Sequence, residues 1–290
     1  MRSTRRILGA ALSLAAILTA GSAGVAGAAT RAAPSASAAT DGCSLAPTAG
    51  TVTRTVGRRS YRVNVPAGLS GPRVPLLLSL HGAGSTGAQD ELFTGWTPFA
   101  ASHPFIVAYP QARGVSFSGL WDPYTPVSTD VADLKAMAAD IAAQWCVDPQ
   151  RIHVDGWSNG AVMSQRVACD GADTFASVTS YAGGTPSLAG LAAPCSPSRP
   201  IAVGLIAGQF DFTYGGLAQN TDEWTGINDC AATPARSTDA FGTSELYTCA
   251  GGVRVLSRVV GLTSHNWPSG ARGEDQRSRM WAFFEAHPRP

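Results

Sequence analysis

Apolar residues along this 290-residue chain gather in short continuous runs, and between some of these runs they recur at helical spacing. The segments Pro75–Leu80 and Phe105–Tyr109 are mainly apolar, which is typical of strands buried on both faces of a sheet. From Asp130 to Trp145 the apolar residues are spaced as on one face of a helix. This alternation predicts a mostly parallel sheet with crossover helices on both faces. Further strands are expected within Thr51–Val65, Arg199–Ala207 and Val253–Val260, and a closing helix over Glu274–Ala286.

The first residues have the features of an export signal. Three arginines precede an apolar run from Ile7 to about Ala20, and small residues with Ala-x-Ala sites follow. The run is too short and wrongly flanked for a transmembrane helix. We expect residues 1–38 to be a signal peptide and flexible leader, and residues 39–290 to form one secreted, extracellular domain. A twin-arginine route and a general secretory route both stay open, and an N-terminal core helix is the alternative.

Composition narrows the range of partners. Charged residues make up 14% of the chain, and the formal charge of +1 becomes −2 once the first three arginines are removed, or −3 if Arg31 is removed with them. So little net charge gives no reason to expect nucleic acid or an anionic membrane as a partner. The spacing of cysteines and histidines fits no zinc pattern. We therefore expect no metal site, and we expect the protein to be a monomer.

Six cysteines in an exported chain predict disulfide bonds. Cys146 precedes one predicted strand, and Cys169 lies about three turns along the helix that follows it, so both are expected at the same end of the sheet. Another two cysteines flank one segment near the C-terminus. One or more free buried thiols are the alternative. The predicted pairs are Cys146–Cys169, Cys230–Cys249 and, by elimination, Cys43–Cys195.

The strongest chemical signal is the pentapeptide Gly156-Trp157-Ser158-Asn159-Gly160, which follows a β-like run and precedes a helix-like run. In that context Gly-x-Ser-x-Gly is the nucleophile elbow of an α/β-hydrolase. Side chains at the two glycine positions would crowd the sharp turn that lifts the serine out of the sheet. The sequence therefore predicts an α/β-hydrolase fold with Ser158 as the nucleophile.

A serine nucleophile needs a histidine base and an acid that orients this base, and in this fold they follow in the order Ser, Asp or Glu, His. Of the two histidines after the elbow, His287 lies near the C-terminus. His265 follows a predicted strand, where a loop carrying the base belongs. The predicted acid is Asp211, shortly after the preceding strand, with Asp222 and Asp239 as alternatives.

Two backbone amides are expected to stabilise the oxyanion. One belongs to Asn159, directly after the nucleophile, and the other to the loop His81-Gly82-Ala83-Gly84 that follows the strand ending at Leu80. Ala83 is the predicted donor and Gly84 the alternative. His81 is expected to support this loop and not to act as a second base.

Several further motifs accompany these residues. They are Leu80-His81-Gly82-Ala83-Gly84, Gly95-Trp96, the segments 105–111 and 146–152, and His265-Asn266-Trp267-Pro268. Together they resemble the secreted esterases of carbohydrate esterase family one, which groups polyhydroxybutyrate depolymerases with feruloyl and acetylxylan esterases. The resemblance implies an α/β-hydrolase fold, a Ser158–Asp211–His265 triad and no cofactor. The acid loop departs from the usual His-Gly-x-x-Asp-Pro of the family, since it reads Ala-Gly-Gln-Phe-Asp-Phe.

The expected activity is hydrolysis of carboxylic esters through an acyl-enzyme. A hydroxyalkanoate polyester is the leading substrate class, and a feruloyl or acetyl ester on plant polysaccharide is the alternative. A peptidase and a non-catalytic secreted binding module are more distant alternatives. Aromatic residues near the predicted site are candidate substrate-binding residues, with core packing as the alternative for each. They are Trp96, Trp121, Phe210, Phe212, Tyr214 and Trp267.

Overall fold

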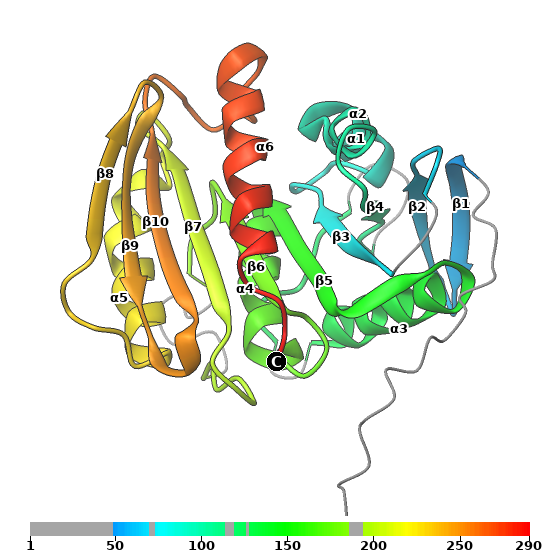
Figure 1. Ribbon diagram of the computed structural model, residues 1–290, viewed down its shortest axis with the longest axis horizontal. Coiled ribbons are helices and arrows are strands. Elements are labelled where there is room, and N and C mark those ends of the chain that lie inside the picture. The colour runs from blue at the N-terminus through cyan, green and yellow to red at the C-terminus, as the bar shows by residue number, and fades with distance from the viewer. Residues whose placement is uncertain (1–48, 70–72, 114–118, 126–127, 186–193) are drawn as a thin grey trace, which may run out of the picture. The chain divides into compact units, whose positions relative to one another are not determined.

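A ten-stranded sheet organises the described part of the chain, which in this computed structural model comprises residues 49–69, 73–113, 119–125, 128–185 and 194–290. The strand order is β1-β2-β4-β3-β5-β6-β7-β10-β9-β8 (Figure 1). Strands β4 to β10 in this order are parallel, and antiparallel pairs form both edges. The mostly parallel sheet predicted from the sequence is therefore confirmed. The predicted leader over residues 1–38 lies outside the described residues.

The strands follow the apolar runs of the sequence closely. The hairpin of β8 and β9 was not predicted. The strands are β1 (Gly50–Val56), β2 (Arg59–Val65), β3 (Val74–Leu80), β4 (Ile106–Pro110), β5 (Val147–Trp157), β6 (Ser177–Tyr181), β7 (Ala202–Gly208), β8 (Ala235–Asp239), β9 (Gly242–Thr248) and β10 (Arg254–Val260).

Helices connect the strands and cover the sheet. None of the described helices is both long and apolar enough to cross a membrane. They are α1 (Gly87–Thr94), α2 (Trp96–Ala100), α3 (Thr129–Gln144), α4 (Asn159–Gly171), α5 (Leu217–Ile227) and α6 (Gly270–Glu285), with short 3-10 turns at Tyr214–Gly216 and Ala250–Gly252.

Two apolar layers lie on opposite faces of the sheet. Successive residues of a strand point to opposite faces, and β3 accordingly gives Leu76 and Leu78 to one layer and Leu77 to the other. Helices α3, α4 and α5 pack on the first layer, whereas α2 and α6 pack on the second. Because both faces are covered, the central strands must be apolar throughout, which explains the continuous runs in the sequence.

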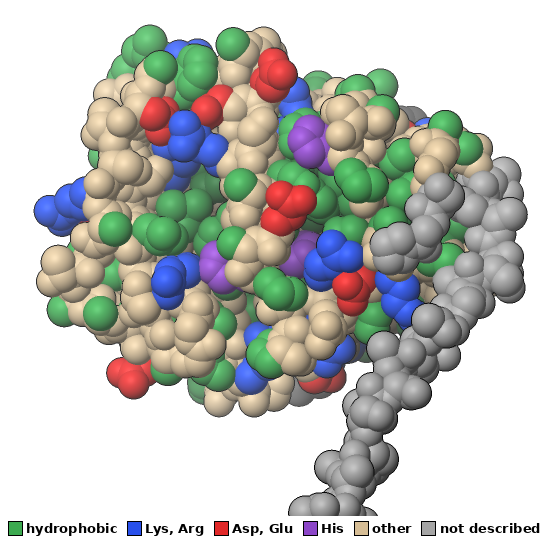
Figure 2. All heavy atoms as spheres, viewed as in Figure 1, with side chains coloured by type: hydrophobic (Ala, Val, Ile, Leu, Met, Phe, Trp, Pro, Cys, Tyr) green, Lys and Arg blue, Asp and Glu red, His purple; other side chains and the backbone are tan. Residues whose placement is uncertain are grey.

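Because these strands are parallel, the carboxyl ends of β3, β5, β7 and β10 lie at the same end of the sheet (Figure 1). The loops after these strands contain the predicted oxyanion loop, nucleophile, acid and base. The fold therefore brings the predicted oxyanion loop, nucleophile, acid and base to the same end of the sheet, as the Gly-x-Ser-x-Gly motif requires. On the face seen in Figure 2, basic and acidic side chains are mixed.

The disulfide bonds correct part of the predicted pairing. Cys169 is bonded to Cys195, so the predicted Cys146–Cys169 and Cys43–Cys195 pairs are both wrong. Helix α4 ends at Gly171 and leads into β6, which lies beside β7, so Cys169 ends up close to the segment that precedes β7 and not to the start of β5. The predicted Cys230–Cys249 bond is present. Cys146 is also disulfide-bonded, and Cys43 lies outside the described residues.

Candidate active site

The nucleophile elbow joins β5 to α4. Ser158 has φ 57° and ψ −119°, a backbone conformation that L-residues rarely adopt and that a tight strand-to-helix turn imposes. A Cβ atom at Gly156 would lie 2.1 Å from the Gly160 oxygen, and a Cβ atom at Gly160 would lie 2.0 Å from the Leu80 oxygen. Both positions therefore need glycine, because the turn packs directly against the neighbouring backbone.

The base candidate reaches the nucleophile from the loop after β10. The Nε2 atom of His265 lies 2.8 Å from the Oγ atom of Ser158, within hydrogen-bond distance. Two aromatic rings lie close to the imidazole: the Phe212 ring centroid is 4.2 Å away and the Trp157 centroid is 5.8 Å away. His287, the other histidine after the elbow, packs against Phe283 at the end of α6.

The acid candidate lies on the turn after β7. Both carboxylate oxygens of Asp211 lie 3.0 Å from the Nδ1 atom of His265. The backbone N–H and the hydroxyl of Thr213 also donate to Asp211 Oδ1, at 2.7 and 2.8 Å, and this fixes the carboxylate. The Thr213 contacts were not predicted, because no sequence pattern marks them.

The alternative acids have other surroundings. Asp239 pairs with the buried Arg258 at 2.8 Å, and the hydrogen bond with this guanidinium holds the pKa of the Asp239 carboxyl well below its usual range. Asp222 is exposed on α5. The structure therefore brings Ser158, His265 and Asp211 together and leaves Asp222 and Asp239 outside this group.

The acid and base loops are also joined to each other. The Phe210 N–H donates to the Thr263 oxygen at 2.8 Å, and the Leu262 N–H donates to the Gln209 side chain at 3.1 Å. A Cβ atom at Gly208 would lie 2.5 Å from the Thr263 oxygen, so these loops touch backbone to backbone. This contact holds the acid and the base at a fixed separation.

The predicted oxyanion loop begins directly after β3 and passes beside the nucleophile. A Cβ atom at Gly82 would lie 2.8 Å from Trp157 Cε3 and 3.3 Å from Ser158 Cβ, so only glycine fits there. The Gly84 N–H donates to the Gly119 oxygen at 3.1 Å. Among the described residues, the Ala83 N–H has no hydrogen-bond partner, which leaves it available to a ligand.

The candidate substrate-binding aromatics fall into two groups. Phe210, Phe212 and Tyr214 are exposed, at 65%, 80% and 44%, and the Phe212 ring lies beside His265. The remaining aromatics are buried. Trp121 packs against His81, Trp267 packs edge-on against Tyr181, and the Trp96 indole donates to Asp155 at 2.9 Å. Trp96, Trp121 and Trp267 are therefore core residues, which is the alternative that the sequence left open for each of them.

Within the described residues, no cluster of histidine, cysteine, aspartate or glutamate side chains has the composition of a metal site. The arrangement that remains is a hydroxyl, an imidazole and a carboxylate in series, with the loop that carries Ala83 passing close to the serine. Such a series can activate a serine for attack on a carbonyl carbon and can hold the oxyanion that results.

Known proteins similar to this chain include several esterases. The prolyl oligopeptidase family matches residues 93–189, less than half of the chain. "Feruloyl esterase B" of Piromyces equi is 26% identical over 254 residues, which cover 78% of this chain and 45% of that protein. "Poly(3-hydroxyalkanoate) depolymerase C" of Paucimonas lemoignei is 29% identical over 189 residues, covering 61% of this chain and 45% of that protein.

The solved structure of an acetyl xylan esterase from Aspergillus awamori superposes with a TM-score of 0.65 at 15% identity, covering 82% of this chain and 99% of that one. This likeness and the strand order show the α/β-hydrolase fold. The chain is related to the esterase family of polyhydroxybutyrate depolymerases and feruloyl and acetylxylan esterases, as its motifs predicted. It spans about half the length of the curated relatives that it matches first.

Proposed function

We propose that this chain is an exported esterase that cleaves carboxylic esters through an acyl-enzyme. Ser158 Oγ attacks the ester carbonyl carbon, and His265 takes the serine proton and passes it to the departing alkoxide. Water then attacks the acyl-enzyme, with His265 again as the base, and releases the acid. Asp211 keeps the imidazole in the required tautomer. The hydrogen bonds in series from Ser158 to His265 to Asp211 support these roles.

The N–H groups of Asn159 and Ala83 are the proposed oxyanion donors. Asn159 is the first residue of α4, where N–H groups have no partner within the helix and the helix dipole favours negative charge. The Ala83 N–H, which has no hydrogen-bond partner among the residues that the structure describes, lies on the loop that passes beside Ser158. Donors aimed at the developing oxyanion lower the barrier more than they strengthen substrate binding.

Within this class, we propose a hydroxyalkanoate polyester as the substrate. The observation that carries this proposal is the exposure of large apolar side chains on the loops of the acid and the base. Phe210, Phe212 and Leu262 are 65%, 80% and 73% exposed. Apolar groups kept in water around a nucleophile are suited to contact with an apolar solid. Burial on such a surface yields about 25 cal/mol for each Å² removed from water.

A feruloyl ester is the second candidate. Trp157 and Phe212 both lie beside His265, so an aromatic acyl group could pack against either ring while its carbonyl meets Ser158. The 26% identical feruloyl esterase relative also favours this substrate. An acetyl group offers too little surface to use these rings. We therefore expect kcat/KM to rise from acetyl to butyryl esters.

Export is proposed on two grounds. The disulfide bonds Cys169–Cys195 and Cys230–Cys249 are typical of oxidising compartments. The N-terminal sequence has the arginines, apolar run and small residues of an export signal. Mass analysis of the protein secreted by an expressing host tests this proposal, because cleavage after either Ala-x-Ala site would place the mature N-terminus at residue 29 or residue 39.

The reaction class is tested with a fluorophosphonate probe and a panel of soluble esters. Wild-type protein should be labelled at Ser158 and should hydrolyse butyryl esters, whereas Ser158→Ala should show neither property and still fold. Loss of about a thousandfold or more in kcat is expected, because the nucleophile is removed. A Ser158→Ala variant that keeps most of its activity would refute the assignment.

The substrate class is tested by clearing of a polyhydroxybutyrate suspension. Phe212→Ser should slow clearing more than it slows hydrolysis of a soluble butyryl ester. Phe93→Ser is the matched control, because Phe93 is also 60% exposed but lies on α1, outside the acid and base loops. Fast hydrolysis of feruloyl esters without polymer clearing would favour the second candidate. An acetyl preference would exclude both and indicate a polysaccharide deacetylase.

A further inference from the structure

The two proposed oxyanion donors lie on separate segments, and one residue contacts both segments. We propose that Trp121 is a positioning residue that clamps the oxyanion loop to the nucleophile elbow and so fixes the two donors relative to each other. This inference rests on the proposed ester hydrolysis and adds a residue to it. Trp121 was expected to contact substrate, but it is 97% buried, with an exposed fraction of 3%.

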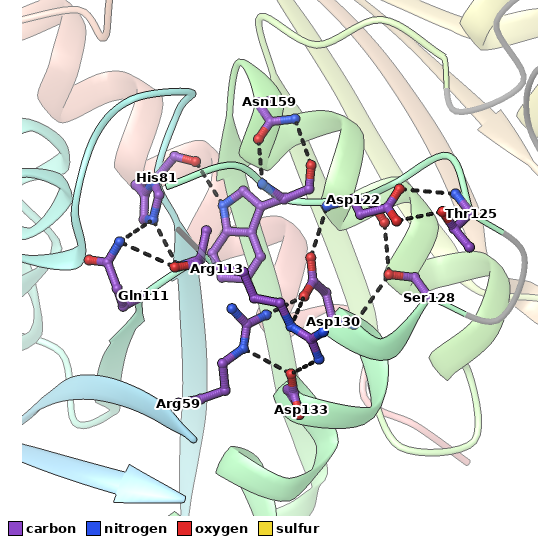
Figure 3. A network of polar contacts seen from close by, with 12 residues as sticks. Arg59, His81, Gln111, Arg113, Asp122, Thr125, Ser128, Asp130, Asp133 and Asn159 are labelled. Atoms are coloured by element: carbon purple, nitrogen blue, oxygen red, sulfur yellow. Dashed lines mark hydrogen bonds and ion pairs between the residues drawn. The ribbon is translucent and has the colours of Figure 1, made fainter. Parts of the chain in front are cut away.

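On the elbow side, Trp121 is held through its backbone. The Trp121 N–H donates to Asn159 Oδ1 at 2.8 Å, and Asn159 Nδ2 donates to the Trp121 oxygen at 3.3 Å (Figure 3). The side-chain amide thus pairs with the peptide groups of one residue in the way that two strands pair. Because the proposed donor is the N–H of the same Asn159, this pairing ties that donor to Trp121.

On the loop side, Trp121 is held through its indole. The indole N–H donates to the His81 oxygen at 2.9 Å, and the ring packs against the imidazole of His81 with centroids 5.3 Å apart. Phenylalanine would keep most of the ring packing but could not donate this hydrogen bond. The indole N–H is therefore the group that lets Trp121 hold the His81 backbone, which an apolar side chain in its place could not do.

His81 passes this constraint on to the second donor. Its Nε2 atom accepts the Ala112 N–H at 3.1 Å, so the proton of the neutral ring is on Nδ1, which lies 2.8 Å from the Gly82 oxygen. Burial lowers the pKa of His81, which keeps the ring neutral. The Gly82 oxygen and the Ala83 N–H belong to one planar peptide group. Fixing the oxygen therefore fixes the direction of the Ala83 N–H.

Charged residues also contact Trp121 and its neighbour Asp122. The Arg59 guanidinium lies 5.8 Å from the indole centroid, and Asp130 and Asp133 bind this guanidinium. Asp130 also accepts the N–H of Asp122, the next residue along the chain, at 2.8 Å. The backbone, the indole N–H and the ring face of Trp121 are thus each engaged, so the side chain has little freedom to shift.

Fixing the two donors in this way should stabilise the transition state more than it stabilises the bound substrate. The donors meet full negative charge only when the carbonyl oxygen becomes an oxyanion, so a loosened hole should lower kcat and leave KM nearly unchanged. Removing a single oxyanion donor typically costs about 100- to 1,000-fold in kcat. A donor that is loosened but still present should cost less, and we expect a loss of about tenfold or more.

The test compares Trp121→Phe with Trp281→Phe. Trp281 is a matched control because it is also 3% exposed, stacks on Phe105, and has no hydrogen-bond partner for its indole nitrogen among the described residues. For each variant we would measure kcat and KM on a butyryl ester, the melting temperature, and the inhibition constant of a trifluoromethyl ketone. In that adduct Ser158 Oγ bonds to the ketone carbon, His265 takes the serine proton, and the ketone oxygen becomes the oxyanion.

Trp121→Phe should lower kcat and weaken the ketone by similar factors, whereas Trp281→Phe should change only the melting temperature. Asn159→Ala breaks the clamp from the elbow side, so the double variant should lose less than the sum of the two single effects. Wild-type kcat and ketone affinity in Trp121→Phe, or a loss seen only in KM, would overturn the proposal. If Trp121→Phe does not fold, Asn159→Ala alone decides by the same measurements.

The two proposals can fail separately. If the wild-type protein hydrolyses no ester of the panel, ester hydrolysis is refuted. The affinity for the trifluoromethyl ketone still tests the clamp in that case, because the adduct needs only the serine, the histidine and the hole. If the wild-type protein is an active esterase but Trp121→Phe behaves like Trp281→Phe, only the clamp is refuted.

Discussion

The Nδ1 atom of His265 lies 3.0 Å from both carboxylate oxygens of Asp211, although the two residues are on loops that follow different strands. The loops are joined by the bond from the Phe210 N–H to the Thr263 oxygen. Since the imidazole donates from Nδ1 to the carboxylate, Nε2 is left free to accept the serine proton. In the proposed mechanism, Asp211 thus sets the tautomer of His265 through a contact that the fold itself holds in place.

Asp211→Asn should leave a folded but nearly inactive protein. An amide in this place can donate to the imidazole and so favour the wrong tautomer, and a loss of about 10,000-fold in kcat is typical of this change in serine hydrolases. Asp222→Asn is the control, because Asp222 is exposed on α5. Steady-state kinetics on a butyryl ester would check this prediction. Equal activity of Asp211→Asn and wild type would mean that another group orients His265.

Gly82→Ala should lower kcat because the new methyl group would meet Trp157 at 2.8 Å and push the oxyanion loop away from Ser158. Overpacking of this kind typically costs about 1–3 kcal/mol of stability as well. Gly226→Ala is the control, since a Cβ atom there meets nothing within 4 Å. Kinetics and thermal melting of both variants give the comparison. A fully active Gly82→Ala would show that the loop can shift without affecting the reaction.

The residues of the site that could be predicted are those marked by a short sequence motif or by their order along the chain in this fold. Ser158 is marked by five consecutive residues, and the order of nucleophile, acid and base along an α/β-hydrolase selects Asp211 and His265 from few candidates. The role proposed for Trp121 had no such signal. It depends on contacts with His81 and Asn159, about 40 residues away on either side in the sequence.

In the fold, too, the elements that could be predicted are those with a signal in the local sequence. Strands β3 and β4 are buried on both faces and therefore appear as apolar runs. Strands β8 and β9 are largely solvent-accessible, so no apolar alternation marks them in the sequence. The pairing of Cys169 with Cys195 depends on where α4 ends relative to β7, which spacing along the chain does not encode.

Proteolysis without reduction should recover the Cys169–Cys195 and Cys230–Cys249 peptides. Removing the first bond with a Cys169→Ser, Cys195→Ser double variant should destabilise the protein by about 2–4 kcal/mol, because the bond limits the freedom of the unfolded chain. It should leave kcat nearly unchanged, since α4 carries Cys169 near its end and Ser158 precedes its start. Mass mapping and urea unfolding are the measurements. Recovery of a Cys146–Cys169 peptide would contradict the structure.

Two buried carboxyl groups should make stability depend on pH in an unusual direction. Asp90 and Asp155 are 2% and 0% exposed, and desolvation by burial raises the pKa of each from its ordinary 3.8 to about 7. Hydrogen bonds from Ser79 to Asp90 and from Trp96 and Thr179 to Asp155 offset only part of this effect.

The sign follows from linkage between protonation and folding. Below a pH of about 4 these groups are protonated in both states, so their contribution to stability is fully present. As the pH rises from about 4 to about 7, the unfolded chain releases these protons and the folded protein keeps them. The free energy of unfolding should therefore fall by up to about 1.4 kcal/mol per group and pH unit. Carboxylates with lowered pKa values, such as Asp140, act in the opposite direction.

Asp90→Asn isolates this effect, because the amide keeps the shape of the side chain and does not titrate. The variant should lose less stability than wild type between pH of about 5 and about 8, measured by urea unfolding at both values. Asp222→Asn, on the exposed side of α5, should follow the wild-type dependence. The contrast between the two variants removes the contribution of every other titrating group. If Asp90→Asn and Asp222→Asn lose equal stability over this range, the Asp90 carboxyl is not protonated in the folded protein and the predicted direction is wrong.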